Sequence, residues 1–299
     1  MSGDDPLWPR ASDWLASGGG PAPGRPMLAV VGVPLSRTSI SPSGADATPA
    51  AVRAALRRFS TYHAGLDVDL EHVAVTDLGD LDVADATVSD HLERVVLPAV
   101  DAGLVVVLGG DNAVTRPAMR SLLPLATSAL LTLDAHHDVR GFHAGPTNGT
   151  PVRGLVEDGL PGSHVVQVGL GTLTNSRAYR DWCEDRGIRL VGVDEARGRV
   201  AEVVRAELDR LASRCEAVYV DLDVDVVDSA FVPGCPGARP GGLQPWELLA
   251  AAAEAGRHPA VRAVDVVEVD ATRDPTGVTV DLAAQCLLAV AAGLAARER

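Results

Sequence analysis

Lysine is absent from the chain, and all 26 basic residues are arginine. Without lysine there is no ε-amine for a Schiff base, and neither a P-loop nor a kinase-type phosphate clamp can be built. Basic charge is also scarce, because the acidic residues leave a formal net charge of −14. Nucleic acids and anionic membranes bind proteins through clustered basic charge, so we expect neither as a partner.

Cysteine is scarce and lacks motif spacing. Its four positions, Cys183, Cys215, Cys235 and Cys286, contain no CxxC pair. This pattern fits reduced thiols in a cytoplasmic enzyme better than a disulfide framework. No stretch resembles a signal peptide or a membrane span, so we expect a soluble protein.

The chain is long enough for one full hydrophobic core. It has 299 residues, of which 46% are hydrophobic, and no linker or composition shift divides it. Residues 1–25 are rich in Gly, Pro and Ser, and we expect a flexible arm there, with Trp8 and Trp14 as candidate anchors on a neighbouring subunit. Residues 26–299 should form a single domain.

Strand and helix patterns alternate along this domain. Short apolar runs predict strands at Leu28–Val33, Leu104–Leu108, Ala129–Leu133, Val165–Val168, Leu190–Val193, Ala217–Val220 and Val264–Val269. Helical patterns cover Pro49–Phe59, Val88–Ala102, Asn175–Arg186, Glu195–Arg214, Pro245–Ala255 and Val280–Ala296. Continuous apolar strands indicate a sheet that is covered on both faces, hence a mostly parallel sheet of about eight strands in a three-layer α/β/α domain.

Acidic residues follow the predicted strands. They are Asp111, Asp134, Asp223, Asp225, Glu268 and Asp270. In open α/β sheets ligands bind beyond the carboxyl ends of the strands, so these side chains should meet on one rim. Carboxylates gathered at the edge of a core repel one another and lose hydration, which is tolerable when they are protonated or share a cation.

The type of these side chains indicates the cation. One imidazole, from His136, among many carboxylate oxygens suits Mn²⁺ or Mg²⁺ better than Zn²⁺, which favours His and Cys. We therefore expect a site for two cations, with Mn²⁺ as the expected metal. The Asp221–Asp225 run alone could also suggest a calcium loop or a phosphatase of the haloacid-dehalogenase type. It lacks the turn glycine and the bidentate Glu of the first, and it lies too late in the chain for the second.

Taken with their flanking residues, these motifs resemble the ureohydrolase family, which includes arginase, agmatinase and formimidoylglutamase. The resemblance extends from about Leu28 to Gly293. Its motifs appear as Gly109-Gly110-Asp111-Asn112, Asp134 to Asp138, Asp223 with Asp225 and Asp228, the loop from Pro233 to Gly242, and Glu268-Val269-Asp270-Ala271. The resemblance implies an arginase-like fold, with residues 26–299 as the catalytic domain, and a family habit of assembling as trimers or hexamers.

The resemblance also implies the metal ligands. One metal would be held by Asp134, His136, Asp223 and Asp225. The other would be held by Asn112, Asp134, Asp138 and Asp223. The family has His where Asn112 stands, and an amide oxygen is a weaker neutral ligand. We therefore expect this second position to bind its metal less tightly or to stay empty, or Asn112 to lie outside a mononuclear site.

Family chemistry implies roles for further residues. Metal-activated water attacks the trigonal carbon of an amidine or guanidine, Asp138 takes its proton, and Glu268 pairs with the cationic amidinium. A second departure lies at Asn148, where arginases and many relatives have the His assigned to proton shuttling. We name His143 as the candidate replacement, with His137 as an alternative that could equally be a residue pointing away from the ligands.

The arginines in the loops indicate the substrate. Formiminoglutamate carries two carboxylates, and Arg140, Arg153, Arg177 and Arg239 lie in loops that could pair with them, beside Asn148. The Pro-Gly loop also departs from the form typical of agmatinases. The chain thus looks like the formimidoylglutamase branch, known from histidine degradation. The alternatives are an agmatinase-like or other guanidino-acid hydrolase, and a catalytically weakened homologue with a binding or regulatory role.

Overall fold

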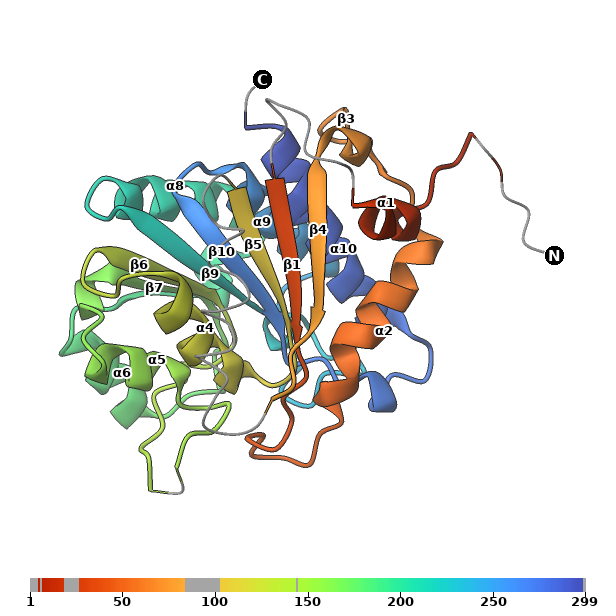
Figure 1. Ribbon diagram of the computed structural model, residues 1–299. Coiled ribbons are helices and arrows are strands. Elements are labelled where there is room, and N and C mark those ends of the chain that lie inside the picture. Colours follow the sequence, from red (N-terminus) through yellow and green to blue (C-terminus); the bar gives the residue numbers. More distant parts are fainter. Residues whose placement is uncertain (1–4, 6, 19–26, 84–102, 144, 298–299) are drawn as a thin grey trace.

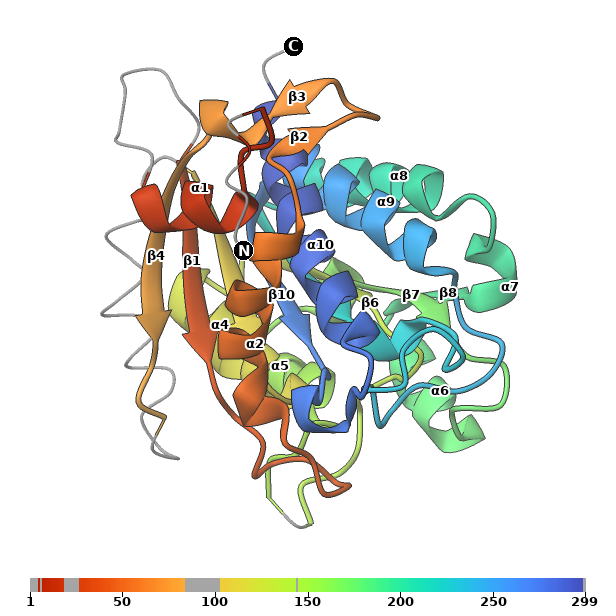
Figure 2. The ribbon, with the colours of Figure 1, turned by 90° about the vertical axis from the view of Figure 1, so that its right-hand side faces the viewer.

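The fold is a three-layer α/β/α sandwich in which one central sheet separates two layers of helices (Figures 1 and 2). A computed structural model of the chain describes residues 5, 7–18, 27–83, 103–143 and 145–297. The predicted α/β class and three-layer arrangement are confirmed. The predicted helix at Val88–Ala102 lies outside the described residues.

The central sheet has eight strands in the order β4-β1-β5-β10-β9-β6-β7-β8. Every neighbouring pair is parallel. The strands are β1 (Met27–Val33), β4 (Ala74–Asp80), β5 (Gly103–Gly109), β6 (Ser128–Leu133), β7 (Val165–Leu170), β8 (Arg189–Gly192), β9 (Ala217–Asp223) and β10 (Val261–Val267). A small antiparallel pair, β2 (Tyr62–His63) and β3 (Val68–Asp69), lies apart from it.

The helices divide between the two faces of the sheet (Figures 1 and 2). One face is covered by α1 (Ala11–Ser17), α2 (Thr48–Ala55), α7 (Val193–Ala196), α8 (Val200–Ala212), α9 (Pro245–Arg257) and α10 (Val278–Ala295). The other is covered by α4 (Thr115–Leu122), α5 (Pro151–Glu157) and α6 (Arg177–Glu184). Short 3-10 turns follow several strands, among them η5 (Asn112–Val114), η7 (Val224–Val226) and η8 (Ala271–Arg273).

Alternation along β5 explains the layering. Leu104, Val106 and Leu108 belong to the core on one face, whereas Val105 and Val107 belong to the core on the other face. Successive strand side chains point to opposite faces, so a strand buried on both sides is apolar at most positions. This is why the continuous apolar runs predicted the strands correctly.

All seven predicted strands are present, but β4 was missed. This edge strand reads Ala-Val-Thr-Asp-Leu-Gly-Asp, and its second half is only partly buried, so it lacks the continuous apolar signal. The helices α4 and α5 were also missed; each has only about two turns. The predicted helix at Glu195–Arg214 is two helices, α7 and α8, separated near Gly198, which has a positive φ of 79°.

The prediction of a flexible arm at residues 1–25 is wrong for Ala11–Ser17, and residues 1–4, 6 and 19–25 lie outside the described residues. Residues Ala11–Ser17 form α1, and Trp14 is buried, with its indole Nε1 donating to the backbone oxygen of Val73 at 3.1 Å. Trp14 therefore anchors α1 on the same chain. Trp8 stays partly exposed and stacks with Arg10 at 3.7 Å.

Helix α10 is long and strongly apolar. By length and composition it could cross a membrane, yet 72% of it is buried inside the domain. It packs most closely against α9, where Gly256 and Gly293 leave no space for a side chain. These features are those of a core helix in a layered fold.

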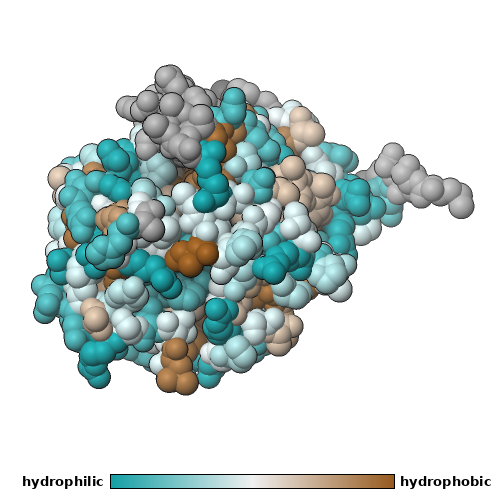
Figure 3. All heavy atoms as spheres, turned by 90° about the horizontal axis from the view of Figure 1, so that it is seen from below, coloured by the Kyte–Doolittle hydropathy of each residue, from teal (hydrophilic) through white to brown (hydrophobic). Residues whose placement is uncertain are grey.

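The topology gathers four strand ends. β5, β10, β9 and β6 are neighbours, so the loops that follow them meet at one edge of the sheet, at the bottom of Figure 1. Figure 3 looks onto this end, which is mostly hydrophilic with small, separated hydrophobic spots. The predicted rim of strand ends is therefore present, and the polar residues that follow these strands lie there.

Candidate active site

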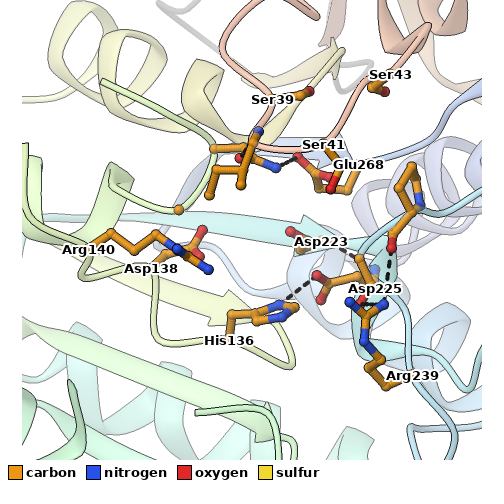
Figure 4. Close-up of a pocket in the computed structure, with 15 residues that line it drawn as sticks. Ser39, Ser41, Ser43, His136, Asp138, Arg140, Asp223, Asp225, Arg239 and Glu268 are labelled. Atoms are coloured by element: carbon orange, nitrogen blue, oxygen red, sulfur yellow. Dashed lines mark hydrogen bonds and ion pairs between the residues drawn. The ribbon is translucent and has the colours of Figure 1, made fainter. Parts of the chain in front are cut away.

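A polar pocket of about 110 Å³ opens at this rim. It is lined by Ser39, Ile40, Ser41, Ser43, His136, Asp138, Arg140, Asn148, Gly149, Asp223, Asp225, Pro236, Gly237, Arg239 and Glu268 (Figure 4). A larger cavity of about 460 Å³ shares His136, Arg140, Asp225 and Arg239 as part of its wall. A small reacting group could occupy the first space while its tail extends toward the second.

Three predicted ligands form a compact cluster beside this pocket. Asp134, His136 and Asp225 each offer one ligand atom, and these atoms lie within 4.8 Å of one another. His136 Nδ1 is 2.7 Å from Asp225 Oδ2 and 3.5 Å from Asp134 Oδ1. Asp134 Oδ2 is fully buried and has no hydrogen-bond partner among the residues that the structure describes. A buried carboxylate oxygen without a donor is a place where a cation is needed.

The remaining predicted ligands meet next to this cluster. Asn112 donates from Nδ2 to Asp138 Oδ2 at 2.8 Å and to Asp223 Oδ2 at 3.2 Å. Asn112 lies in the 3-10 turn after β5, Asp138 in the loop after β6, and Asp223 at the end of β9. Three chain segments thus bring an amide and two carboxylates together, as the sequence predicted.

Burial and mutual repulsion set the ionisation of the carboxyl groups. They raise the pKa of Asp134 to about 7, with Asp225 as the repelling charge. Burial with the neighbouring carboxylates also raises the pKa values of Asp138 and Asp223 well above their ordinary value. Such a group resists ionisation until positive charge arrives, and a divalent cation supplies it. The donor set therefore fits a hard divalent cation.

His136 and Asp225 form the exception. Burial opposes protonation of the imidazole, yet the Asp225 carboxylate outweighs it and raises the pKa of His136 to about 12. Burial likewise opposes ionisation of Asp225, and the imidazolium overcomes it, so that the pKa of this carboxyl is lowered. A cation at this position would displace the imidazole proton, because a metal-binding nitrogen must be unprotonated.

Two site residues have left-handed backbones. Asp138 has φ 51° and Glu268 has φ 63°, a region that non-glycine residues seldom adopt. Hydrogen bonds on both sides hold them, since Arg153 N donates to Asp138 O at 3.2 Å and Glu268 N donates to Gly110 O at 3.0 Å. Such strain persists only where the surroundings fix it, and here it directs two carboxyl groups into the pocket.

Glu268 lies opposite the cluster. Its Oε1 accepts from the backbone N of Asn112 at 2.8 Å and from Asn148 Nδ2 at 3.0 Å. Burial raises the pKa of Glu268 to about 8, although these two donors favour the charged form. Asn148 is itself held, because its Oδ1 accepts from Ile40 N at 3.0 Å. The predicted residues Glu268 and Asn148 thus line the pocket together.

Two strand-end acids do not enter the pocket. Asp111 accepts from the hydroxyl groups of Thr38 and Ser39 and from Ala113 N. Asp270 accepts from Gly44 N and from Thr272. Both carboxylates tie the 34–44 loop to the rim and cap the turns that follow their strands. Their place on the rim was predicted, but they hold the wall of the pocket.

Of the four arginines predicted to bind the substrate, two line the pocket and two do not. Arg140 and Arg239 line the pocket (Figure 4). Arg239 Nη1 donates to the backbone oxygens of its own loop, from Pro236 to Ala238. The Arg140 guanidinium has no hydrogen-bond or ion-pair partner within the described part of the chain. It is therefore available for an anionic ligand.

Arg153 and Arg177 lie outside the pocket. Arg153 Nε donates to Val139 O at 2.8 Å, and its guanidinium stacks on Trp182 at 4.5 Å. Arg153 stabilises the loop that carries Asp138, and its position does not support the predicted contact with the substrate. Arg177 begins α6 and lines a separate cavity near His137, so the structure does not bring it to the pocket either.

Neither candidate proton-shuttling histidine faces the pocket. His143 is exposed in the loop after β6 and lies against Gly141. His137 is buried, with Nδ1 at 2.7 Å from Gln167 Oε1, and burial lowers its pKa. The expectation of His143 as a catalytic residue is thus not supported by its position, and His137 points away from the ligands.

Several residues of the site were not predicted. Ser39, Ser41 and Ser43 form one wall of the pocket (Figure 4). The sequence signal that could have predicted this wall is the run Ser-Ile-Ser-Pro-Ser, which follows a strand. The buried Thr115 hydroxyl lies next to both Asn112 Oδ1 and Asp265 Oδ2. No local sequence pattern predicts the contact with Asp265, because it joins α4 to β10.

Comparisons with known proteins agree with this geometry. A profile of the Arginase family matches residues 27–293. A curated formimidoylglutamase from Halalkalibacterium halodurans is 34% identical over 87% of this chain and 84% of its own. The crystal structure of formimidoylglutamase from Bacillus subtilis superposes with a TM-score of 0.88, at 31% identity, over 99% of this chain and 94% of its own.

A further solved structure, Trypanosoma cruzi formiminoglutamase with Mn²⁺, shares the fold at a TM-score of 0.83 and 23% identity, over 96% of this chain and 99% of its own. At this identity the likeness concerns the fold alone. The resemblance to a family that rested on short motifs therefore extends over the whole domain.

Proposed function

Since the chain belongs to the Arginase family, we propose that it hydrolyses the C–N bond of N-formimidoyl-L-glutamate to give L-glutamate and formamide. The observation that carries the proposal is one pocket that contains Glu268 and Arg140 and borders the Asp134, His136 and Asp225 cluster. The Arg140 guanidinium has no partner among the described residues. A cation-binding end beside a cationic wall matches an amidine that carries carboxylates.

The donor set indicates how the site works. Divalent cations held by Asp134, His136, Asp223 and Asp225, with Asn112 and Asp138 completing a second position, would lower the pKa of water and polarise the amidine. We propose Mn²⁺ at two positions per subunit, because carboxylate oxygens with one imidazole suit it.

The chain's own side chains carry the remaining steps. Glu268, held by Asn112 N and Asn148, faces the pocket and would pair with the amidinium. Asp138, buried beside the cation position, would accept the proton of water as its oxygen bonds to the amidine carbon. The C–N bond to glutamate then breaks, and its nitrogen takes a proton to leave as an amine.

The substrate's carboxylates would bind the arginine side of the pocket. Arg140 can form a bidentate pair, and the hydroxyl groups of Ser41 and Ser43 offer donors on the opposite wall. Agmatine carries a cationic tail, which this wall would repel. The complete Asp134, His136, Asp223 and Asp225 set likewise argues against a catalytically weakened homologue.

The experiment is a substrate panel assayed with purified, metal-free protein and added Mn²⁺. Formimidoylglutamate should release glutamate and formamide, whereas agmatine and arginine should stay unchanged. Hydrolysis of agmatine or of a guanidino acid, without hydrolysis of formimidoylglutamate, would overturn the proposal. No cation-dependent hydrolysis of any amidine would favour a binding or regulatory role instead.

Three wider expectations go with this function. We propose that the protein acts in the cytoplasm, which fits the absence of any disulfide among its four buried cysteines. We also propose that it assembles into a homo-oligomer, as a trimer or hexamer, which sedimentation or light scattering would measure. Finally, we propose that its partners are small-molecule amidines, and that it binds neither nucleic acid nor a membrane.

A further inference from the structure

The Asn112 amide occupies the place where a second cation would need an oxygen ligand. Its Nδ2 faces Asp138 Oδ2 at 2.8 Å and Asp223 Oδ2 at 3.2 Å, so both amide hydrogens serve carboxylates. Its Oδ1 faces away from the pocket, toward Thr115 Oγ1 at 2.7 Å. In this orientation Asn112 donates hydrogen bonds to the two carboxylates and presents no oxygen atom to a cation.

Thr115 continues into a buried chain of polar groups. Its Oγ1 lies 2.8 Å from Asp265 Oδ2, and the same oxygen accepts from the Tyr219 hydroxyl at 2.9 Å. Thr115, Asp265 and Tyr219 are all fully buried, on α4, β10 and β9. A buried network of this kind is stable only if each close contact contains a hydrogen.

With the Asp265 carboxyl group ionised, the two contacts of Thr115 Oγ1 share a single hydrogen. A threonine hydroxyl has a single hydrogen, and two acceptors, Asn112 Oδ1 and Asp265 Oδ2, compete for it. Turning the amide by half a turn about its Cβ–Cγ bond removes the conflict. Asn112 Nδ2 then donates to Thr115 Oγ1, Thr115 donates to Asp265, and Asn112 Oδ1 faces the carboxylates of Asp138 and Asp223.

The two orientations suit opposite states of the site. With Nδ2 toward the carboxylates, amide hydrogens take the place of positive charge. With Oδ1 toward them, three oxygens converge, which is favourable only if a cation lies between them. We propose that Thr115, oriented by Asp265, is the positioning residue that turns Asn112 from a hydrogen-bond donor into a cation ligand.

This proposal rests on the proposed function only in needing a cation at the second position. It predicts an asymmetric cost of removing the Thr115 hydroxyl. The cation-free state loses one hydrogen bond, from Thr115 to Asn112 Oδ1. The cation-bound state loses two, from Asn112 Nδ2 to Thr115 and from Thr115 to Asp265. Cation binding at the second position is therefore weakened, whereas the Asp134, His136 and Asp225 position is untouched.

The test titrates Mn²⁺ into metal-free protein and follows both positions by calorimetry and by the electron paramagnetic resonance signal of a coupled ion pair. Thr115→Val, which keeps the shape of the side chain, should weaken the second position about tenfold or more, as the loss of outer hydrogen bonds to metal ligands does. The first position should keep its affinity. Thr115→Ser, which keeps the hydroxyl, should behave as the wild-type protein does.

A matched control is Thr132→Val on β6. Thr132 is also fully buried, and its hydroxyl has no hydrogen-bond partner among the described residues. This change removes a buried threonine hydroxyl without touching the network, so both positions should keep their affinities. Equal weakening in the two valine variants would assign the effect to packing and overturn the proposal, as would two unchanged affinities in Thr115→Val.

A second measurement does not depend on any variant. An atomic-resolution crystal structure of the wild-type protein with Mn²⁺ should place Asn112 Oδ1 on the second ion and Nδ2 against Thr115 Oγ1. An amide that keeps the opposite orientation, or a wild-type protein that binds one ion only, would refute the mechanism. None of these readouts uses substrate, so a failure to hydrolyse formimidoylglutamate would leave them intact.

Discussion

The two halves of the metal centre neutralise their carboxylates differently. In the Asp134, His136 and Asp225 half, an imidazolium lies 2.7 Å from a carboxylate and stands where a cation would bind. In the half formed by Asn112, Asp138 and Asp223, the uncharged amide of Asn112 donates hydrogen bonds to the two carboxyl groups. The pKa values of Asp138 and Asp223 stay raised. An imidazole can exchange its proton for a metal, whereas an amide must turn over. We therefore expect the first half to bind its cation more tightly.

The largest effect should come from Asp134, which with Asp223 belongs to both proposed sets of ligands. Asp134→Asn removes a carboxylate on which both cation positions depend, and hydrolysis should fall by roughly three orders of magnitude, because metal stabilisation of the transition state contributes several kcal/mol. Steady-state kinetics with added Mn²⁺ measures it. Asp194→Asn, which changes an exposed carboxylate in α7, is the matched control and should keep its activity. Full activity of Asp134→Asn would remove the basis for the comparison.

Making the halves alike should abolish their difference. Asn112→His places an imidazole in the second half, and the affinity of that position for Mn²⁺ should rise by roughly tenfold or more, since imidazole is the stronger ligand. Calorimetric titration of wild-type and variant proteins measures the two affinities. An unchanged second affinity would mean that Asn112 does not limit cation binding.

Loss of Arg140, on the wall of the pocket, should weaken substrate binding more than it slows the chemical step. Arg140→Ala should raise KM for formimidoylglutamate by about tenfold, the cost of a charge-assisted hydrogen bond, and change kcat less. Arg177→Ala, which removes an arginine from the separate cavity, should leave KM as it is. A larger effect at Arg177 than at Arg140 would mean that the substrate's tail takes the other route.

The smallest effect concerns the stability of the metal-free protein. The pKa of Asp134 is raised to about 7 and that of Glu268 to about 8. A carboxyl group with a raised folded-state pKa stabilises the fold fully below its ordinary pKa, and this contribution is lost as pH rises through the folded value. The melting temperature should thus fall by at least about 4 °C between pH 5 and pH 8.

Adding Mn²⁺ at pH 8 should restore the melting temperature, because the cation binds the ionised carboxylates of the folded state. Calorimetric scans at several pH values, with and without Mn²⁺, provide the measurement. Stability that rises over this range in the metal-free protein would contradict the assigned pKa directions.

The sequence predicted the rim because the direction of parallel strands is set by the chain. Asp134, Asp223 and Glu268 follow continuous apolar runs, so their meeting at one edge needed no knowledge of loops. The side chains in the loops were harder to place. Arg140 and Arg153 lie close in sequence, and only the folded loop shows that one enters the pocket while the other donates to Val139 O.

The same limit applies to the residues that were missed. Thr115 and Asp265 are 150 positions apart, and nothing near either one indicates that they touch. His143 was chosen for its proximity in sequence, yet its loop carries it to the surface. Strand β4 was missed because an edge strand need not be apolar throughout. Patterns of period two or 3.6 report burial, whereas contacts between distant segments depend on tertiary packing.

The place of β10 has a consequence for how the protein matures. This strand is the last in the chain, yet it lies between β5 and β9 at the centre of the sheet. Asn112 follows β5 and Asp223 ends β9, so a nascent chain can assemble the second cation position only after β10 has been made and lies between these two strands. The Asp134, His136 and Asp225 cluster joins the neighbouring strands β6 and β9, so it does not depend on β10 and can form before the second position does.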